Sequence, residues 1–214
     1  MSVSSNLSTA DTEQTAFNRV TGDLTRQGWA VCERFLSQGS LAGLAGAIRK
    51  LWEQGRFHKA GIGRKTVPQL HSDIRGDYIL WLEDCATPVI SRFVAQELES
   101  LRQALNAATY LGLYEFEGHL AVYPPGCGYA RHVDQFRNAQ ERLVSLVLYL
   151  NEGWRAEEGG ELCLYPPSLP QGRSVAVPPI GGTLAVFLSA EMPHEVLPAT
   201  RYRFSLSGWF RSRS

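Results

Sequence analysis

Three side chains of this sequence could together hold a metal ion. His132 and Asp134 stand two residues apart in a segment that alternates like a β-strand, so both side chains should point to one face. A second histidine would complete a set of two imidazoles and one carboxylate, which holds non-haem Fe(II) and leaves coordination positions open. His194 is the preferred third ligand because several predicted strands separate it from His132, while His119 and His71 are the competing candidates.

A strand near the C-terminus offers a partner for an anion. In Tyr202–Phe210, alternation places Arg203, Ser205, Ser207 and Trp209 on one face. A guanidinium and hydroxyls on the inward face of a barrel strand would be costly unless an anion met them. Because a guanidinium matches a carboxylate with two parallel hydrogen bonds, the natural candidate is 2-oxoglutarate, whose keto-acid end chelates iron. The competing interpretation is a surface arginine on an edge strand.

The elements that must position these side chains follow from the periodicity of apolar residues. Amphipathic helices are predicted over 9–27, 40–54 and 88–107, with Gly28 and Gly55 ending the first two. Short strands are predicted at 29–32, before Trp81, and at 111–115, 118–123, 130–134, 142–150, 160–165, 174–177, 183–188, 195–197 and 202–210. Helices followed by many short strands predict an α+β fold, in which N-terminal helices support a double-stranded β-helix (jelly-roll) barrel core.

Length and composition limit the classes of function. The chain has 214 residues, 20% of them charged, and a net charge of zero, which argues against a nucleic-acid partner. A polar N-terminus, four scattered cysteines and no bilayer-spanning apolar run predict a cytoplasmic protein that binds no membrane. We expect a monomer with one catalytic domain: a disordered segment 1–8, a helical support region 9–109 with a loop at 59–73, and the jelly-roll core at 110–214.

Taken together, these motifs resemble the Fe(II)/2-oxoglutarate-dependent dioxygenases, and more narrowly the prolyl hydroxylases that act on hypoxia-inducible factor. The matching segments, in order, are Ile74–Asp77 with Trp81, Tyr123-Pro124, Gly128–Asp134, Tyr149–Trp154, Gly159–Leu162, and Pro193–Ala199 running on to Arg203 and Trp209. The chain is shorter at both ends than the animal enzymes, and in this it is similar to the compact bacterial members of the group.

The resemblance implies a role for each matching residue. The catalytic iron ligands would be His132, Asp134 and His194. The residues that bind 2-oxoglutarate would be Arg203, Tyr149, Tyr123 and Trp209, with Arg201 as the rival to Arg203. The residues that contact the substrate would be Arg142, Trp81, Arg75, Asp77 and Tyr129. The loop 59–73, which composition alone would make a surface connection, would be the mobile segment that folds over the target proline.

The resemblance also implies an activity. Such an enzyme uses Fe(II), 2-oxoglutarate and O2 to 4-hydroxylate a prolyl residue in a protein loop, with release of succinate and CO2 and with ascorbate as a candidate reductant. For the bacterial members, the implied protein substrate is elongation factor Tu. The alternatives are a 2-oxoglutarate oxygenase for a small molecule or free amino acid, and a non-catalytic jelly-roll module that binds a partner.

Overall fold

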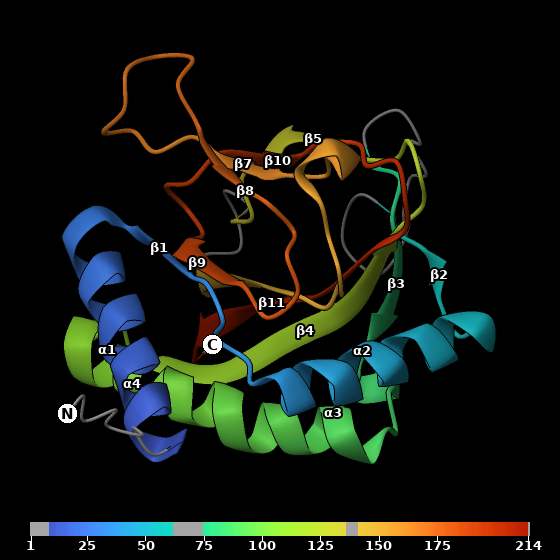
Figure 1. Cartoon of the computed structure of the whole chain (residues 1–214). Coiled ribbons are helices and arrows are strands. Elements are labelled where there is room, and N and C mark those ends of the chain that lie inside the picture. The colour runs from blue at the N-terminus through green and yellow to red at the C-terminus, as the bar shows by residue number, and fades with distance from the viewer. Residues whose placement is uncertain (1–8, 62–74, 136–140, 214) are drawn as a thin grey trace, which may run out of the picture.

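Two antiparallel β-sheets face each other, and helices cover the outer side of the larger one (Figure 1). The computed structural model describes residues 9–61, 75–135 and 141–213. The strands of the larger sheet are, in order, β1 (Trp29–Cys32), β9 (Leu184–Leu188), β6 (Arg142–Tyr149), β11 (Arg203–Ser212), β4 (Leu113–Tyr123), β3 (Tyr78–Trp81) and β2 (His58–Lys59). Those of the smaller sheet are β5 (Tyr129–His132), β10 (His194–Val196), β7 (Leu162–Leu164) and β8 (Val175–Val177).

The helices follow the predicted periodicity with one irregularity. Helices α1 (Thr9–Gln27) and α2 (Gln38–Glu53) form where predicted, and the hydroxyl of Ser37 caps α2 by accepting a hydrogen bond from the backbone of Ser40. The third predicted helix consists of α3 (Pro88–Phe93), a π-helical turn (Val94–Leu98) and α4 (Glu99–Thr109). Apolar spacing places Val89 on the buried face of this helix, but Ile90 is buried instead and Val89 is 39% exposed.

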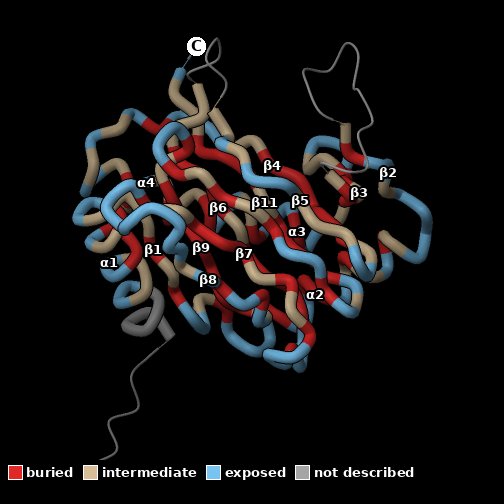
Figure 2. Tube along the Cα trace, turned by 90° about the horizontal axis from the view of Figure 1, so that it is seen from above, coloured by how far each residue is buried: buried red, intermediate tan, exposed pale blue. Residues whose placement is uncertain are grey.

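Two apolar layers hold the fold together. The first lies between the helices and the larger sheet and includes Leu44, Ile48, Leu101 and Phe210. The second lies between the two sheets and includes Phe187, with its neighbours Tyr149, Leu162, Leu164 and Val196. Figure 2 shows the buried trace running through the strands while loops and outer helix faces are exposed. Since both layers meet on the larger sheet, its central strands β9, β6 and β11 are largely buried on both faces, whereas the edge strand β2 is exposed.

The jelly-roll core is confirmed, with two differences from the prediction. Among the described residues, hydrogen bonding does not join the two sheets into a closed barrel. Two predicted strands, 111–115 and 118–123, form the single strand β4, which pairs with β11 from Tyr123 opposite Arg203 to Leu113 opposite Ser212. Gly118, the first residue of the second predicted strand, faces Gly208 across the ladder beneath the ring of Phe116, so its lack of a side chain makes room for that ring.

Some predictions fall outside the described residues, namely the disordered segment 1–8 and the part of the predicted substrate loop from residue 62 onward. In the described part of the chain, no helix is both long and apolar enough to cross a bilayer.

We expect Gly208→Ala to lower the free energy of unfolding by about 2 kcal/mol, because an added methyl group overpacks the ladder. A Cβ at this position would lie 2.5 Å from both the Glu117 carbonyl oxygen and a Phe116 ring carbon. Gly46→Ala in α2 is the matched control: nothing lies within 4 Å of the new atom, and alanine stabilises a helix by about 0.5–1 kcal/mol relative to glycine. Urea unfolding measures both, and equal effects would contradict this assignment.

Candidate active site

His132, Asp134 and His194 meet between the two sheets. Each offers one ligand atom, and these three atoms lie within 4.8 Å of one another. Asp134 Oδ1 is 3.6 Å from His132 Nε2 and 3.7 Å from His194 Nε2. The antiparallel pairing of β5 with β10 sets His194 directly opposite His132, which explains why distant positions in the sequence converge. The strand predicted over 130–134 ends at His132, and a bend after it brings the Asp134 carboxylate back toward both imidazoles.

Hydrogen bonds behind the cluster fix the orientation of each side chain. The Nδ1 atoms of His132 and His194 lie 2.8 Å and 2.9 Å from the carbonyl oxygens of Ala130 and Met192. A carbonyl can only accept, so each Nδ1 carries the proton and each Nε2 keeps a lone pair that can bind a metal.

The carboxylate is held in the same way. Asp134 Oδ2 accepts a hydrogen bond of 2.7 Å from the Ser145 hydroxyl, which lies 2.8 Å from the Ser189 hydroxyl. The sequence singled out neither serine, because their contribution depends on which strands become neighbours. Ser145 lies in β6, and Ser189 directly follows β9, the strand that pairs with β6.

The electrostatics of the cluster suit a cation. Burial lowers the pKa of His194, which favours the neutral imidazole that coordinates metals. Burial alone would raise the pKa of the Asp134 carboxyl, but His194, His132 and the hydroxyl of Ser145 hold it well below its usual range. One carboxylate charge and two imidazole lone pairs therefore face a common point, which is the donor set of a non-haem Fe(II) site.

Arg203 lies in the same cavity and is 1% exposed. Its Nε donates to the Gly160 carbonyl oxygen at 3.0 Å, and its guanidinium carbon lies 5.0 Å from the ring centroids of both Tyr123 and Tyr149. No carboxylate of the described residues lies within ion-pairing distance of it, although the burial of an unpaired charge is costly. This arrangement leaves the guanidinium available to an anionic ligand.

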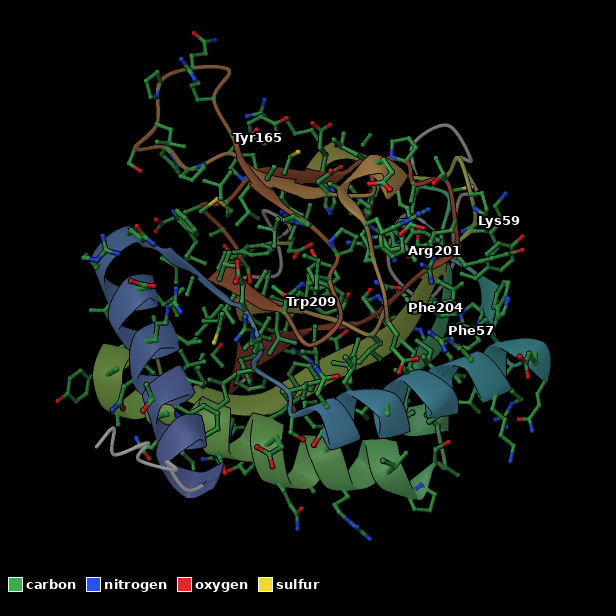
Figure 3. The ribbon with its side chains drawn as sticks, in the orientation of Figure 1. Phe57, Lys59, Tyr165, Arg201, Phe204 and Trp209 are labelled. Atoms are coloured by element: carbon green, nitrogen blue, oxygen red, sulfur yellow. The ribbon has the colours of Figure 1, made fainter. Side chains whose placement is uncertain are left out.

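The rival arginine has a different environment. The Arg201 side chain is 37% exposed, lies 3.4 Å from the Glu158 carboxylate, and rests over the ring of Trp154. In Figure 3, Arg201 lies toward the edge of the molecule, whereas Trp209, which lines the cavity with Arg203, lies near its centre. The predicted alternation of β11 is thus observed: Arg203 and Trp209 face the cavity, while Phe204 packs on the helix side.

Three polar atoms in or beside the cavity are buried without a hydrogen-bond partner in the described structure: Tyr149 Oη, Trp209 Nε1 and His119 Nδ1. Leaving such an atom unsatisfied costs about 1–3 kcal/mol, so their gathering in one place indicates a polar ligand. Burial raises the pKa of Tyr149 and of Tyr123, so both hydroxyls stay protonated and can donate to a carboxylate.

The five residues predicted to contact the substrate lie around this cavity in different ways. Tyr129 lines it and stacks on His132, with 3.7 Å between ring centroids and 18° between planes. Arg75 lies over Tyr129 and forms a two-point ion pair with Asp77, whose carboxylate is buried and therefore faces Arg75 rather than solvent. The last two, Arg142 and Trp81, contact residues that line the cavity.

These two residues contact the cavity wall. The Arg142 guanidinium covers the ring of Trp209 at 3.4 Å and pairs with Glu117 at 2.8 Å. Trp81 meets the ring of His119 edge-on at 5.1 Å. The rim of the cavity is therefore made of aromatic rings and guanidinium groups.

His119 is the functional candidate that the sequence underrated. The residue two positions after it is Ala121 rather than an acidic residue, which argued against a role as a metal ligand, and the structure places it outside the cluster of three. However, it lies in β4 with its side chain lining the cavity, and only 4% of it is exposed. The alternation of β4 with Ala121 and Tyr123 on the same inward face could have indicated this position.

Comparison with known proteins gives a consistent result. The family model of the 2OG-Fe(II) oxygenase superfamily matches residues 118–211. The crystal structure of a Pseudomonas putida prolyl-4-hydroxylase is 40% identical, with a TM-score of 0.82, and the match covers 91% of this chain and 98% of that one. A prolyl hydroxylase from Trichoplax adhaerens, solved in complex with a hypoxia-inducible factor peptide fragment, is 27% identical, with a TM-score of 0.83, over 97% and 94% of the two chains.

Curated relatives are longer than this chain. The hypoxia-inducible factor prolyl hydroxylase of Caenorhabditis elegans is 30% identical over 207 residues, which is 89% of this chain but 27% of that protein. The chain likewise spans 44% of human Egl nine homolog 1.

We expect the burial of His119 to lower the free energy of unfolding at acidic pH. Burial lowers its pKa to about 3, whereas the unfolded chain takes up the proton near pH 6.5. The stabilisation of the neutral form is complete above pH 6.5 and is lost as the pH falls toward 3, at about 1.4 kcal/mol for each pH unit. Unfolding free energies measured from pH 7 to 4 should therefore fall more steeply for the parent protein than for His119→Met. Replacement of the exposed His58 is the control, and equal slopes for the parent and His119→Met would contradict the prediction.

Proposed function

The chain belongs to the 2OG-Fe(II) oxygenase superfamily, among the prolyl hydroxylases, and from this we propose that it 4-hydroxylates a prolyl residue of a protein. One observation carries the proposal: a single cavity contains a two-histidine, one-carboxylate cluster and a buried arginine with no carboxylate partner in the described structure. The first is a donor set for Fe(II), and the second is a site for a carboxylate.

The residues present fit the metal and the co-substrate. His132, Asp134 and His194 would hold Fe(II), since they present two Nε2 lone pairs and one carboxylate toward one point. When bound, Fe(II) and 2-oxoglutarate supply the oxidation, in which O2 and 2-oxoglutarate become succinate and CO2 while a prolyl C–H bond becomes C–OH. The protein holds these groups in place and excludes bulk water from the space between the sheets.

Arg203, Tyr149 and Tyr123 would bind the distal carboxylate of 2-oxoglutarate. The guanidinium supplies the charge, and the protonated Tyr149 hydroxyl, which is buried beside it and finds no acceptor among the described residues, supplies a donor. Binding there would satisfy both groups at once, which explains why a buried charge and a buried hydroxyl are retained side by side.

A protein substrate is supported by the rim of the cavity. Arg142 over Trp209 and Arg75 over Tyr129 are flat aromatic and guanidinium surfaces of the kind that contacts peptides. The Trichoplax adhaerens relative was solved with a peptide fragment bound. Elongation factor Tu is our candidate substrate, on the basis of the similarity to compact bacterial members of the group, and a small molecule or free amino acid is the alternative.

The test is incubation of the Fe(II)-loaded protein with 2-oxoglutarate, O2 and either elongation factor Tu or a set of proline-containing peptides. We expect a mass gain of one oxygen, which tandem mass spectrometry places on a prolyl residue, together with one succinate per hydroxylation. His132→Ala should abolish both products. Succinate formation coupled to oxidation of a small molecule, with no modified proline, would overturn the protein-substrate proposal.

A matched pair of arginine variants tests the co-substrate site. Arg203→Met should raise the dissociation constant of 2-oxoglutarate by about 100-fold, because a charge-assisted hydrogen bond contributes about 1.5–3 kcal/mol. Arg201→Met should change it by less than about twofold, since that guanidinium pairs with Glu158 outside the cavity. Isothermal titration calorimetry on the Mn(II)-loaded proteins measures both constants. The reverse order would assign the site to Arg201.

A further inference from the structure

The strand register of the larger sheet arranges the cavity wall in rows. Residues that face one another across neighbouring strands form each row, and side chains two positions apart on a strand lie in adjacent rows on one face. The rows include, in order, Tyr123 with Arg203; Ile79, Ala121, Ser205 and Tyr149; Trp81, His119, Ser207, Val147 and Ala185; and Glu117, Trp209, Ser145, Phe187 and Trp29.

The anion site and the metal cluster, which are the two ends of the co-substrate site, lie at different rows. Arg203 and Tyr149, the anion site, belong to the first two rows. The metal cluster is tied to the fourth row, because Ser145 donates to Asp134 and the ring of Phe187 packs 4.7 Å from that of His194. The row of His119 therefore lies between the carboxylate anchor and the metal cluster, beside the path that a bound 2-oxoglutarate must follow.

His119 has the properties expected of a ligand-binding residue in this row. Its ring is held by Trp81 at 5.1 Å and Trp209 at 5.5 Å, so its orientation is fixed. Its Nδ1 is buried and has no hydrogen-bond partner among residues 9–61, 75–135 and 141–213. The other polar member of the row, Ser207, lies 3.3 Å from the Ser205 hydroxyl and has no hydrogen bond to His119. Burial keeps the imidazole neutral, since it lowers the pKa to about 3, so one ring nitrogen carries a proton.

We propose that His119 is a further co-substrate-binding residue, whose Nδ1–H donates a hydrogen bond to the keto-acid end of bound 2-oxoglutarate. This inference rests on the proposed function. The keto-acid end presents only acceptor oxygens, so the tautomer that carries its proton on Nδ1 is the one that binds. His119 thereby adds a neutral donor between the cationic anchor and the metal and fixes the rotation of the ligand about its long axis.

Substitutions at His119 can separate the hydrogen bond from the packing. In asparagine the amide nitrogen occupies the place of Nδ1, whereas leucine fills the same space without a polar atom. We expect His119→Leu to weaken 2-oxoglutarate binding to the Mn(II)-loaded protein by about tenfold, and His119→Asn to stay within about threefold of the parent. Succinate is one carbon shorter and ends in a single carboxylate in place of the keto-acid group, so its weaker binding should be the same in all three proteins. The affinity for Mn(II) itself should not change, because His119 is not one of the three ligands.

A second measurement observes the ring of His119 directly in the parent protein. With ring-15N-labelled histidine, the Nδ1 resonance of His119 should shift when 2-oxoglutarate is added to the Zn(II)-loaded protein, and should not shift with succinate. The chain has five histidines, so the absence of one signal in His119→Asn assigns it.

The outcomes separate this inference from the proposed function. If the parent binds 2-oxoglutarate while His119→Leu binds it equally well and the Nδ1 resonance does not move, the role of His119 is refuted and the proposed function stands. Equal weakening by leucine and asparagine, again without a shift, would assign His119 a packing role and refute the hydrogen bond. If the metal-loaded parent binds no 2-oxoglutarate at all, both are refuted.

Discussion

Arg203 and Asp134 carry opposite charges in one cavity but do not form an ion pair with each other. Arg203 is buried, Asp134 is nearly so, and they are not within ion-pairing distance. In a protein interior each charge would normally be neutralised by its neighbour. Here the rings of Tyr123 and Tyr149 and the Gly160 carbonyl hold the guanidinium at one end, while Ser145 and the two imidazoles hold the carboxylate at the other. A divalent cation and a dianion inserted between them add no net charge, so the filled cavity stays balanced.

The two sheets contribute different side chains to this arrangement of charges. The smaller sheet supplies both imidazoles through the pairing of β5 with β10, and the larger sheet supplies Arg203 and the row of His119 through the pairing of β11 with β4. The separation of the two sets depends on the apolar layer between the sheets, where Phe187 and Leu162 pack. A loss of packing there would change the distance from metal to anchor, even though no ligand was altered.

The sequence predicted what depends on local periodicity and missed what depends on neighbours in space. The helices, the strand 29–32 and the inward face of β11 follow from apolar spacing, and Arg203 was placed by the alternation of that strand. The π-helical turn, the continuity of β4 through Gly118, and the bend that carries Asp134 past its strand have no periodic signal. The positions of His119 and Ser145 in the site depend on strand register. Register pairs residues that lie far apart in the chain, and it cannot be read from a single sequence.

Tyr129 is the residue through which the rim and the metal cluster touch. One face of its ring lies against His132, and Arg75, held by the buried Asp77, lies over the ring as well. A peptide that displaced Arg75 or Tyr129 would thereby alter the support of an imidazole of the proposed metal site. Under the proposed function, substrate recognition and the reactivity of the metal would be mechanically linked, and a substitution that changed one of them would have to be accommodated by the other.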